Sequence, residues 1–246
     1  MSQRIYTKRG SLVRDWAESL LSIIFPPQCA CCAKALLDYE DTICTVCRYD
    51  MPITGYFNRK ENYVVSLFAG RALFETASAL MYFQRGSDFQ KMIHRMKYSS
   101  RDDIARVLGE IYGAYLAESP FYEDVDLVIA VPLHFSKKIK RGYNQSDEFA
   151  KAIAKKLGVE FCADALKRER RTKTQARLKT KENRAVNVEG AFVVNKVDRL
   201  AGRNILLVDD VITTGATLEE CAVAINREEL YGTKLYLGAM AVVAHT

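Results

Sequence analysis

The sequence predicts an α/β fold with a mostly parallel sheet flanked by helices, and a small four-cysteine module before it. Short apolar runs alternate with longer segments of helical periodicity from residue 64 onward, which is typical of a parallel sheet. Four cysteines form two close pairs near the N-terminus. A chain of 246 residues is long enough for one sizeable domain with a small appendage.

The cysteine pairs are Cys29-x-x-Cys32 and Cys44-x-x-Cys47. Each pair can place two thiolates on one metal ion, and four thiolates close a tetrahedral shell, so the spacing predicts a structural zinc site. Cys31 is expected to be a spare thiol. Unrelated reduced thiols and a redox dithiol are the alternatives, but no thioredoxin-like βαβ pattern surrounds either pair.

The N-terminal region before the cysteines has apolar residues at helical spacing in Ser11–Phe25, and Pro26-Pro27 should end this helix. The helix either packs on its own domain or docks on a partner or membrane surface. We expect residues 1–50 to form this helix and a zinc module similar to a double zinc ribbon. Residues 51–62 should be a linker, and residues 63–246 should form one domain.

The strands of that domain are expected where apolar and β-branched residues cluster in short runs. These runs are Val64–Phe68, Ala79–Phe83, Val125–Val131, a short stretch of Phe161–Leu166, Ala191–Asn195, Ile205–Val208 and Leu235–Val243.

The helices are expected where apolar residues recur every three or four positions. These segments are Asp88–Tyr98, Asp102–Leu116, Ser146–Leu157 and a helix that begins at Leu218. Arg168–Arg184 is polar, basic and poorly periodic, which predicts a loop or hood.

Charge is concentrated in one part of the chain. The net charge is +6, yet 16 basic and 6 acidic residues lie between His134 and Arg184, so the remainder is net negative. This pattern favours an anionic partner at that segment, although a solvated basic face would look the same. No apolar run approaches the roughly 18–20 residues that span a bilayer, and no secretory signal is evident, so we expect a cytoplasmic protein.

The most informative run lies between residues 205 and 217. An apolar stretch is followed by Asp209 and Asp210, and then by Thr213-Thr214-Gly215-Ala216-Thr217. In a parallel sheet, ligands bind at the carboxyl ends of strands, and a strand-to-helix loop directs N–H groups at an anion. The carboxylates suit sugar hydroxyls or Mg²⁺. A buried strand before a capped helix would not require the adjacent acids, so the run predicts a site for a phosphorylated sugar.

Three further groups could complete such a site. The first is Val131-Pro132-Leu133-His134, at the end of an apolar strand, where His134 could also be an ordinary surface residue. The second is Arg141-Gly142-Tyr143-Asn144-Gln145, whose charge, ring and amides suit a nucleotide or base. The third is a basic stretch that could close over a leaving group, with Lys173, Gln175 and Arg184 as candidate contacts.

The run at residues 205–217 resembles the phosphoribosyl-pyrophosphate motif of the type I phosphoribosyltransferases. The wider set of motifs resembles the ComF family from about Leu20 to Val243. The matching segments are Phe25-Pro26-Pro27-x-Cys29-x-x-Cys32, the second cysteine pair, Met92-Ile93-x-x-Met96-Lys97-Tyr98, Val131–His134, Arg141–Gln145, Thr172-x-x-Gln175-x-x-Leu178, Arg184-x-x-Asn187-Val188-x-Gly190-Ala191-Phe192 and Asp209-Asp210.

This resemblance implies a type I phosphoribosyltransferase-like domain that binds Mg²⁺-phosphoribosyl pyrophosphate or a related sugar phosphate. Asp209 and Asp210 would hold the ribose hydroxyls, directly or near Mg²⁺, and the residues from Thr213 to Thr217 would hold the 5′-phosphate. Leu133, His134 and Arg141 would face pyrophosphate, and the hood around Lys173–Arg184 would exclude water.

The resemblance also implies a role in DNA uptake during natural transformation, with single-stranded DNA and other uptake proteins as partners. Transfer of the phosphoribosyl group to an acceptor is the first expectation for the activity. The alternative is a non-catalytic protein that binds single-stranded nucleic acid or acts as a scaffold of the competence machinery. The acceptor and the oligomeric state have no readable signal in the sequence.

Overall fold

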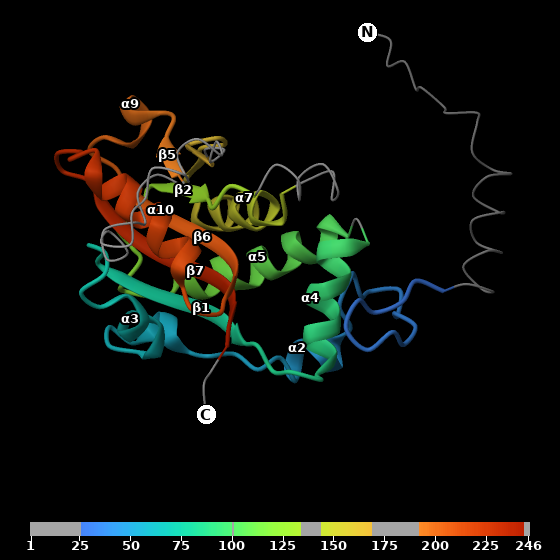
Figure 1. The fold of residues 1–246 in the computed structure, drawn as a ribbon. Helices are drawn as coiled ribbons and strands as arrows, with labels where there is room; N and C mark the ends of the chain where they lie inside the picture. The colour runs from blue at the N-terminus through green and yellow to red at the C-terminus, as the bar shows by residue number, and fades with distance from the viewer. Residues whose placement is uncertain (1–25, 100, 134–143, 169–191, 244–246) are drawn as a thin grey trace, which may run out of the picture. The chain divides into compact units, whose positions relative to one another are not determined.

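The computed structural model describes residues 26–99, 101–133, 144–168 and 192–243 (Figure 1). The chain divides into two compact units, residues 1–50 and residues 51–246. The helix expected at Ser11–Phe25 lies outside the described residues. In the described part of the chain, no helix is both long enough and apolar enough to cross a membrane.

The larger unit is built on a parallel sheet of five strands, which confirms the predicted α/β class. Strand β6 lies at its centre and pairs in parallel with β7 on one side and β2 on the other. A separate antiparallel pair is formed by β4 and β5. In spatial order the sheet strands are β1 (Thr76–Tyr82), β7 (Lys234–Val242), β6 (Asn204–Ile212), β2 (Leu127–Ala130) and β3 (Glu160–Phe161), and the small pair is β4 (Leu166–Arg168) and β5 (Phe192–Val194).

Helices cover both faces of this sheet (Figure 1). Helices α3 and α10 contribute buried side chains to one face, and α5 and α7 pack together on the other. Helix α4 packs against α5. The bounds are α3 (Tyr63–Phe68), α4 (Asp88–Tyr98), α5 (Asp102–Ala117), α7 (Gln145–Leu157), α9 (Val197–Leu200) and α10 (Ala216–Arg227), with a short 3-10 helix η1 (Tyr56–Asn58).

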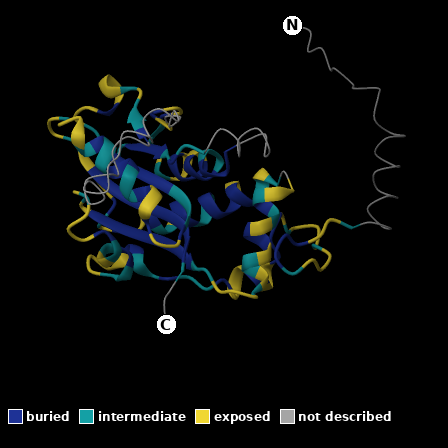
Figure 2. Ribbon diagram, in the orientation of Figure 1, coloured by how far each residue is buried: buried dark blue, intermediate teal, exposed yellow. Residues whose placement is uncertain are grey.

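The core is the sheet itself, whose strands are the most continuously buried part of the larger unit (Figure 2). The segment Ile205–Val208 of β6 is fully buried, as a central parallel strand should be. A cluster of three hydroxyl groups lies deep in this core, where the Ser78 hydroxyl is 2.6 Å from the hydroxyls of both Tyr112 and Tyr122. These three hydroxyl groups form hydrogen bonds with one another, which offsets the free-energy cost of burying them.

Two glycines bring α5 and α7 close together. A Cβ atom on Gly109 would lie 2.5 Å from the carbonyl oxygen of Phe149, and one on Gly113 would lie 2.7 Å from the Cβ atom of Lys156. Only a residue without a side chain fits at either position, so this pair sets the distance between the two helices.

Three sequence predictions about these elements were wrong. Val64–Phe68 is helix α3 and not a strand, because the Asn62 side chain accepts hydrogen bonds from the N–H groups of Val64 and Val65 and caps a helix there. Phe161–Leu166 does not form one continuous strand, because Phe161 belongs to β3 and Leu166 to β4, which lie in different sheets. Strand β6 does not end at Val208, because β7 continues beside it as far as Val242.

The segment that precedes α3 is attached to the edge of the sheet. Ile53 forms an antiparallel bridge with Met81 of β1, and the Thr54 hydroxyl donates to the carbonyl of Ala79. Residues 51–62 therefore have fixed contacts with the larger unit.

The small unit is organised by two tight turns. Gln28 and Ala35 form an antiparallel bridge across the first, and helix α2 (Thr45–Tyr49) follows the second. The Glu40 carboxylate accepts hydrogen bonds from the N–H groups of Leu37 and Thr45. These bonds connect the segment after the first turn to the start of α2.

Candidate functional site

The two acids predicted from the sequence lie on β6 just beyond its last pairing with β2. Ala130 of β2 pairs with Val208, and within the described residues no strand pairs with β6 on that side from Asp209 onward. Successive side chains of a strand point to opposite faces of the sheet. Asp209 therefore shares the face of Ile205 and Leu207, which α10 covers, and Asp210 lies on the face covered by α5 and α7.

Asp209 is partly buried and has an unusual acidity. Burial and the nearby Asp210 carboxylate raise the pKa of Asp209 from 3.8 to about 7, although a hydrogen bond from the Asp210 N–H opposes the shift. The Ser146 hydroxyl lies 3.5 Å from the same carboxylate. A carboxyl group with such a pKa can hold or release a proton near neutral pH.

The loop after β6 has the form expected of a phosphate-binding turn. Thr213 and Thr214 are exposed, and so are Ala216 and Thr217 at the start of α10. The first N–H groups of a helix have no partner within the helix, and its dipole favours an anion there. Asp209 and residues 211–218 line a small hollow at this point.

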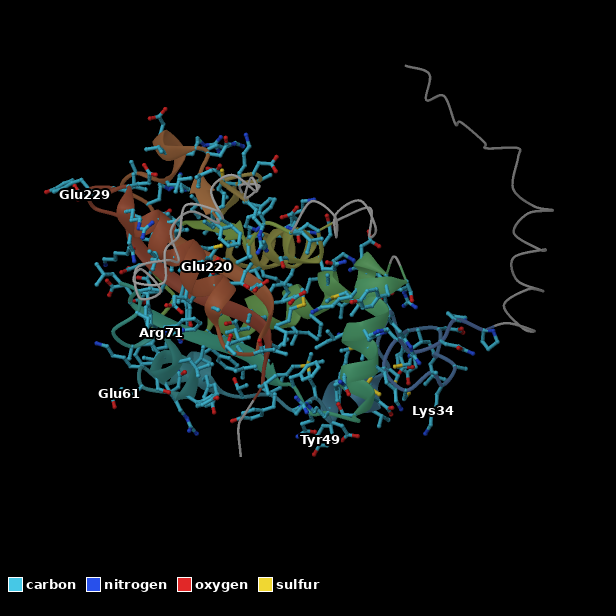
Figure 3. The ribbon with its side chains drawn as sticks, in the orientation of Figure 1. Lys34, Tyr49, Glu61, Arg71, Glu220 and Glu229 are labelled. Atoms are coloured by element: carbon cyan, nitrogen blue, oxygen red, sulfur yellow. The ribbon has the colours of Figure 1, made fainter. Side chains whose placement is uncertain are left out.

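Any side chain at Gly215 would be strained in this turn. Its φ angle of 79° lies in the left-handed region, and a Cβ atom would lie 2.7 Å from the ring of Phe68 in α3. The Arg71 side chain pairs with Glu219 in the first turn of α10, and Arg71 can be located in Figure 3. Helix α3 and the residues after it thus form the support beneath the loop.

The start of α7 lies beside the same end of the sheet. Asn144 caps this helix by accepting from the Ser146 N–H, and its amide donates to the carbonyl of Val131 just after β2. Gln145 is buried, and Leu133 is partly buried in the loop after β2. The ends of β2 and β6 and the start of α7 therefore converge.

Six of the predicted contacts lie outside the described residues. They are His134, Arg141, Tyr143, Lys173, Gln175 and Arg184. Most of the basic residues between His134 and Arg184 also lie outside the described residues.

Three residues near the acids were not identified from the sequence as site residues. Lys97 of α4 forms an ion pair with Asp210, with Nζ 2.8 Å from Oδ2. Ser146 contacts Asp209, and Phe68 supports the loop at Gly215. Lys97 lies in one of the ComF-like motifs, and this motif was the only feature of the sequence that could have pointed to any of the three residues.

The four paired cysteines of the small unit come together as one cluster. The sulfur atoms of Cys29, Cys32, Cys44 and Cys47 all lie within 4.8 Å of one another, and those of Cys32 and Cys44 are 3.8 Å apart. A tetrahedral ion with metal–sulfur bonds of about 2.3 Å places its ligands about 3.8 Å apart. The cluster is therefore compatible with a metal site.

Backbone hydrogen bonds favour the thiolate form of one of these cysteines. Burial acts against ionisation of Cys29, but backbone hydrogen bonds at Cys44, Cys32 and Cys31 outweigh it and lower the pKa of Cys29 to about 7. The Cys44 N–H to Cys29 Sγ distance is 3.3 Å. A thiolate is the form that binds a metal ion.

The raised pKa of Asp209 predicts a pH-dependent stability. Below about pH 4 the folded and unfolded states both keep the Asp209 proton, and the stabilising effect of the raised pKa is fully present. It is lost as pH rises from about 4 to about 7, because the unfolded state ionises Asp209 in this range while the folded state keeps the proton, and the loss is complete when the folded state ionises as well. Asp209→Asn has no such loss, so its free energy of unfolding relative to wild type should rise by roughly 1–3 kcal/mol from pH 5 to pH 8.

Chemical denaturation of both proteins at several pH values, without Mg²⁺ or phosphate, measures this difference. Asp124→Asn, which changes an exposed carboxylate paired with Lys234, is the control. A constant difference between wild type and Asp209→Asn across this range would contradict the assignment.

Comparison with known proteins places these features in context. The family description "Phosphoribosyl transferase domain" matches residues 127–231, which include both acids and the loop after them. DNA utilization protein YhgH of Escherichia coli O157:H7 is 32% identical over 134 residues, covering 53% of this chain and 58% of that protein. Competence protein F of Haemophilus influenzae is 33% identical over 134 residues, covering 52% of this chain and 58% of its own length.

Among solved structures, glutamine phosphoribosylpyrophosphate amidotransferase from B. subtilis, complexed with ADP and GMP, aligns with a TM-score of 0.40 and 18% identity. The alignment covers 59% of this chain and 30% of that one. The match to curated relatives spans little more than half of their length. Residues 127–231 match the phosphoribosyl transferase domain, and the curated homologues of the chain are YhgH and competence protein F, which confirms the resemblance to ComF proteins.

Proposed function

We propose that the larger unit binds Mg²⁺-phosphoribosyl pyrophosphate, or a related sugar phosphate, at the carboxyl end of β6. The supporting observation is that one strand presents Asp209 and Asp210 and then turns at Gly215 into the start of α10. Carboxylates accept hydrogen bonds from ribose hydroxyls, while a helix N-terminus and threonine hydroxyls donate to a 5′-phosphate. The ribose hydroxyls of a phosphorylated sugar would then face the two carboxylates, and its 5′-phosphate would face the start of α10.

Transfer of the phosphoribosyl group to an acceptor is the reaction that this site would perform. The acceptor would form a bond to C1 as the bond to pyrophosphate breaks, and pyrophosphate would leave with the bonding electrons. The carboxylates fit the oxygen donors that Mg²⁺ prefers, and the ion would neutralise charge on pyrophosphate. Asp209 and Asp210 would orient the ribose and stabilise positive charge that develops on the sugar ring.

The small unit would hold a structural zinc ion between Cys29, Cys32, Cys44 and Cys47. Four sulfur donors without an open position suit zinc and leave no place for a substrate. Residues 1–50 would then be a zinc module joined to the transferase domain. Thiolates of this kind persist in a reducing compartment, which supports a cytoplasmic location.

Binding of single-stranded DNA is a second function, and a specific observation favours it. Tyr39 and Tyr49 of the small unit are 78% and 90% exposed, and two cations of the same unit, Lys34 and Arg48, are exposed as well. Tyr49 and Lys34 are labelled in Figure 3. Exposed rings suit stacking on bases, and exposed cations of the same unit suit contact with phosphates. This activity fits the names of the DNA utilization and competence homologues.

Calorimetry with phosphoribosyl pyrophosphate and Mg²⁺ tests the main proposal. Wild type should bind, and Asp209→Asn/Asp210→Asn should bind at least about 100-fold more weakly, because each carboxylate contact contributes about 1.5–3 kcal/mol. Asp124→Asn should bind as wild type does, because this carboxylate precedes β2, at the opposite end of the sheet. No binding by wild type, or equal binding by the double variant, would sink the proposal.

Metal analysis tests the small unit. Purified protein should contain one zinc ion per chain, and Cys47→Ser should lose it together with the ordered NMR signals of residues 26–50, because metal binding supplies most of the stability of such modules. Cys31→Ser is the control, since its sulfur is not among the four clustered ones. Full zinc content in Cys47→Ser would show that the cluster is not the metal site.

Fluorescence anisotropy with a labelled oligothymidylate tests the second function. Tyr39→Ala/Tyr49→Ala should weaken binding, since base stacking contributes about 1–3 kcal/mol per ring. Tyr231→Ala is the matched control, because Tyr231 is 96% exposed but belongs to the other unit. If both variants bind as tightly as wild type, the two rings have no part in nucleic-acid binding.

A further inference from the structure

Lys97 places a positive charge directly at the acids of the candidate sugar site. Its Nζ atom lies 2.8 Å from Asp210 Oδ2, and the two side chains are only 20% and 17% exposed. By contrast, the ion pair between Lys91 and Asp88 on the same helix joins side chains that are 61% and 50% exposed. The Lys97 pair is therefore shielded from solvent, where an ion pair acts more strongly and breaking it costs more.

The backbone of α4 fixes the point from which Lys97 reaches the acids. Met92, Ile93 and Met96 are buried, and Ser87 caps the start of the helix by accepting from the Gln90 N–H. Lys97 lies in the last turn, directly after the final buried residue. Its charge is thus held by a packed helix and not by a free loop.

The ion pair also acts on the chemistry of the two adjacent acids. Two neighbouring carboxylates attract a proton or a divalent cation, because their like charges oppose each other. The Lys97 ammonium already neutralises one of them at hydrogen-bond distance. An isolated Mg²⁺ ion would have to displace Lys97 from Asp210, whereas Mg²⁺ carried on a diphosphate brings its own oxygen ligands and needs fewer from the protein.

We propose that Lys97 is a positioning residue of the sugar-phosphate site, in which its ammonium orients Asp210 toward a ribose hydroxyl and excludes a free divalent cation from the acid pair. This inference rests on the proposed function of the same site. The metal ion then enters bound to the diphosphate and not ahead of it.

Two measurements on Lys97→Met test this role. Binding of Mn²⁺ alone, followed by electron paramagnetic resonance on zinc-loaded protein, should be at least about tenfold tighter than in wild type, since removal of a charged partner exposes the acids. Affinity for Mg²⁺-phosphoribosyl pyrophosphate should fall about tenfold, because Asp210 loses the group that orients it. Lys97→Arg should restore both properties, and Lys91→Met should change neither.

A purely structural role would not produce a gain of cation binding, and adding Asp210→Asn to Lys97→Met should abolish that gain. If wild type binds the sugar diphosphate, and Lys97→Met binds it equally well without gaining Mn²⁺, Lys97 has no positioning role and the proposed function stands. If wild type itself fails to bind the sugar diphosphate, the proposed function fails, and this inference fails with it.

Discussion

The site depends on the unequal lengths of the strands that flank β6. The strand is paired on both sides through Val208, but β2 ends at Ala130 while β7 continues to Val242. Among the described residues, the segment after Val208 is therefore paired with a neighbouring strand on the β7 side alone. A β2 longer by a few residues would pair with this edge and cover it.

The same geometry gives the two adjacent acids different surroundings. Alternation along the strand sends Asp209 and Asp210 to opposite faces, where they meet different helices. Asp209 lies near Ser146 of α7 and close enough to Cys221 of α10 for their charges to interact. Asp210 meets Lys97 of α4. The two carboxylates thus have different partners and different electrostatic environments, although they are chain neighbours.

Periodicity was sufficient to predict most of the sheet and the long helices, because those segments are buried on regular faces. It failed at Val64–Phe68, where five residues carry too few turns to distinguish a strand from a helix, and the Asn62 cap decided the outcome. The adjacent acids and the glycine turn were visible because they are contiguous in sequence. Lys97 was missed as a site residue because its partner lies more than one hundred positions away, and only the fold joins α4 to β6.

The close contact of α5 and α7 has a consequence for tolerance to mutation far from the ligand. Gly109 and Gly113 let the two helices approach so closely that a single added methyl group would collide with the carbonyl oxygen of Phe149 or with the Cβ atom of Lys156. We expect relief of that collision to move α7 away from α5, and its N-cap Asn144 and its residue Ser146, which contacts Asp209, to move with it. The distance between α5 and α7 therefore determines where Ser146 lies relative to Asp209. A substitution at Gly109 or Gly113 should change that position although neither glycine belongs to the candidate site.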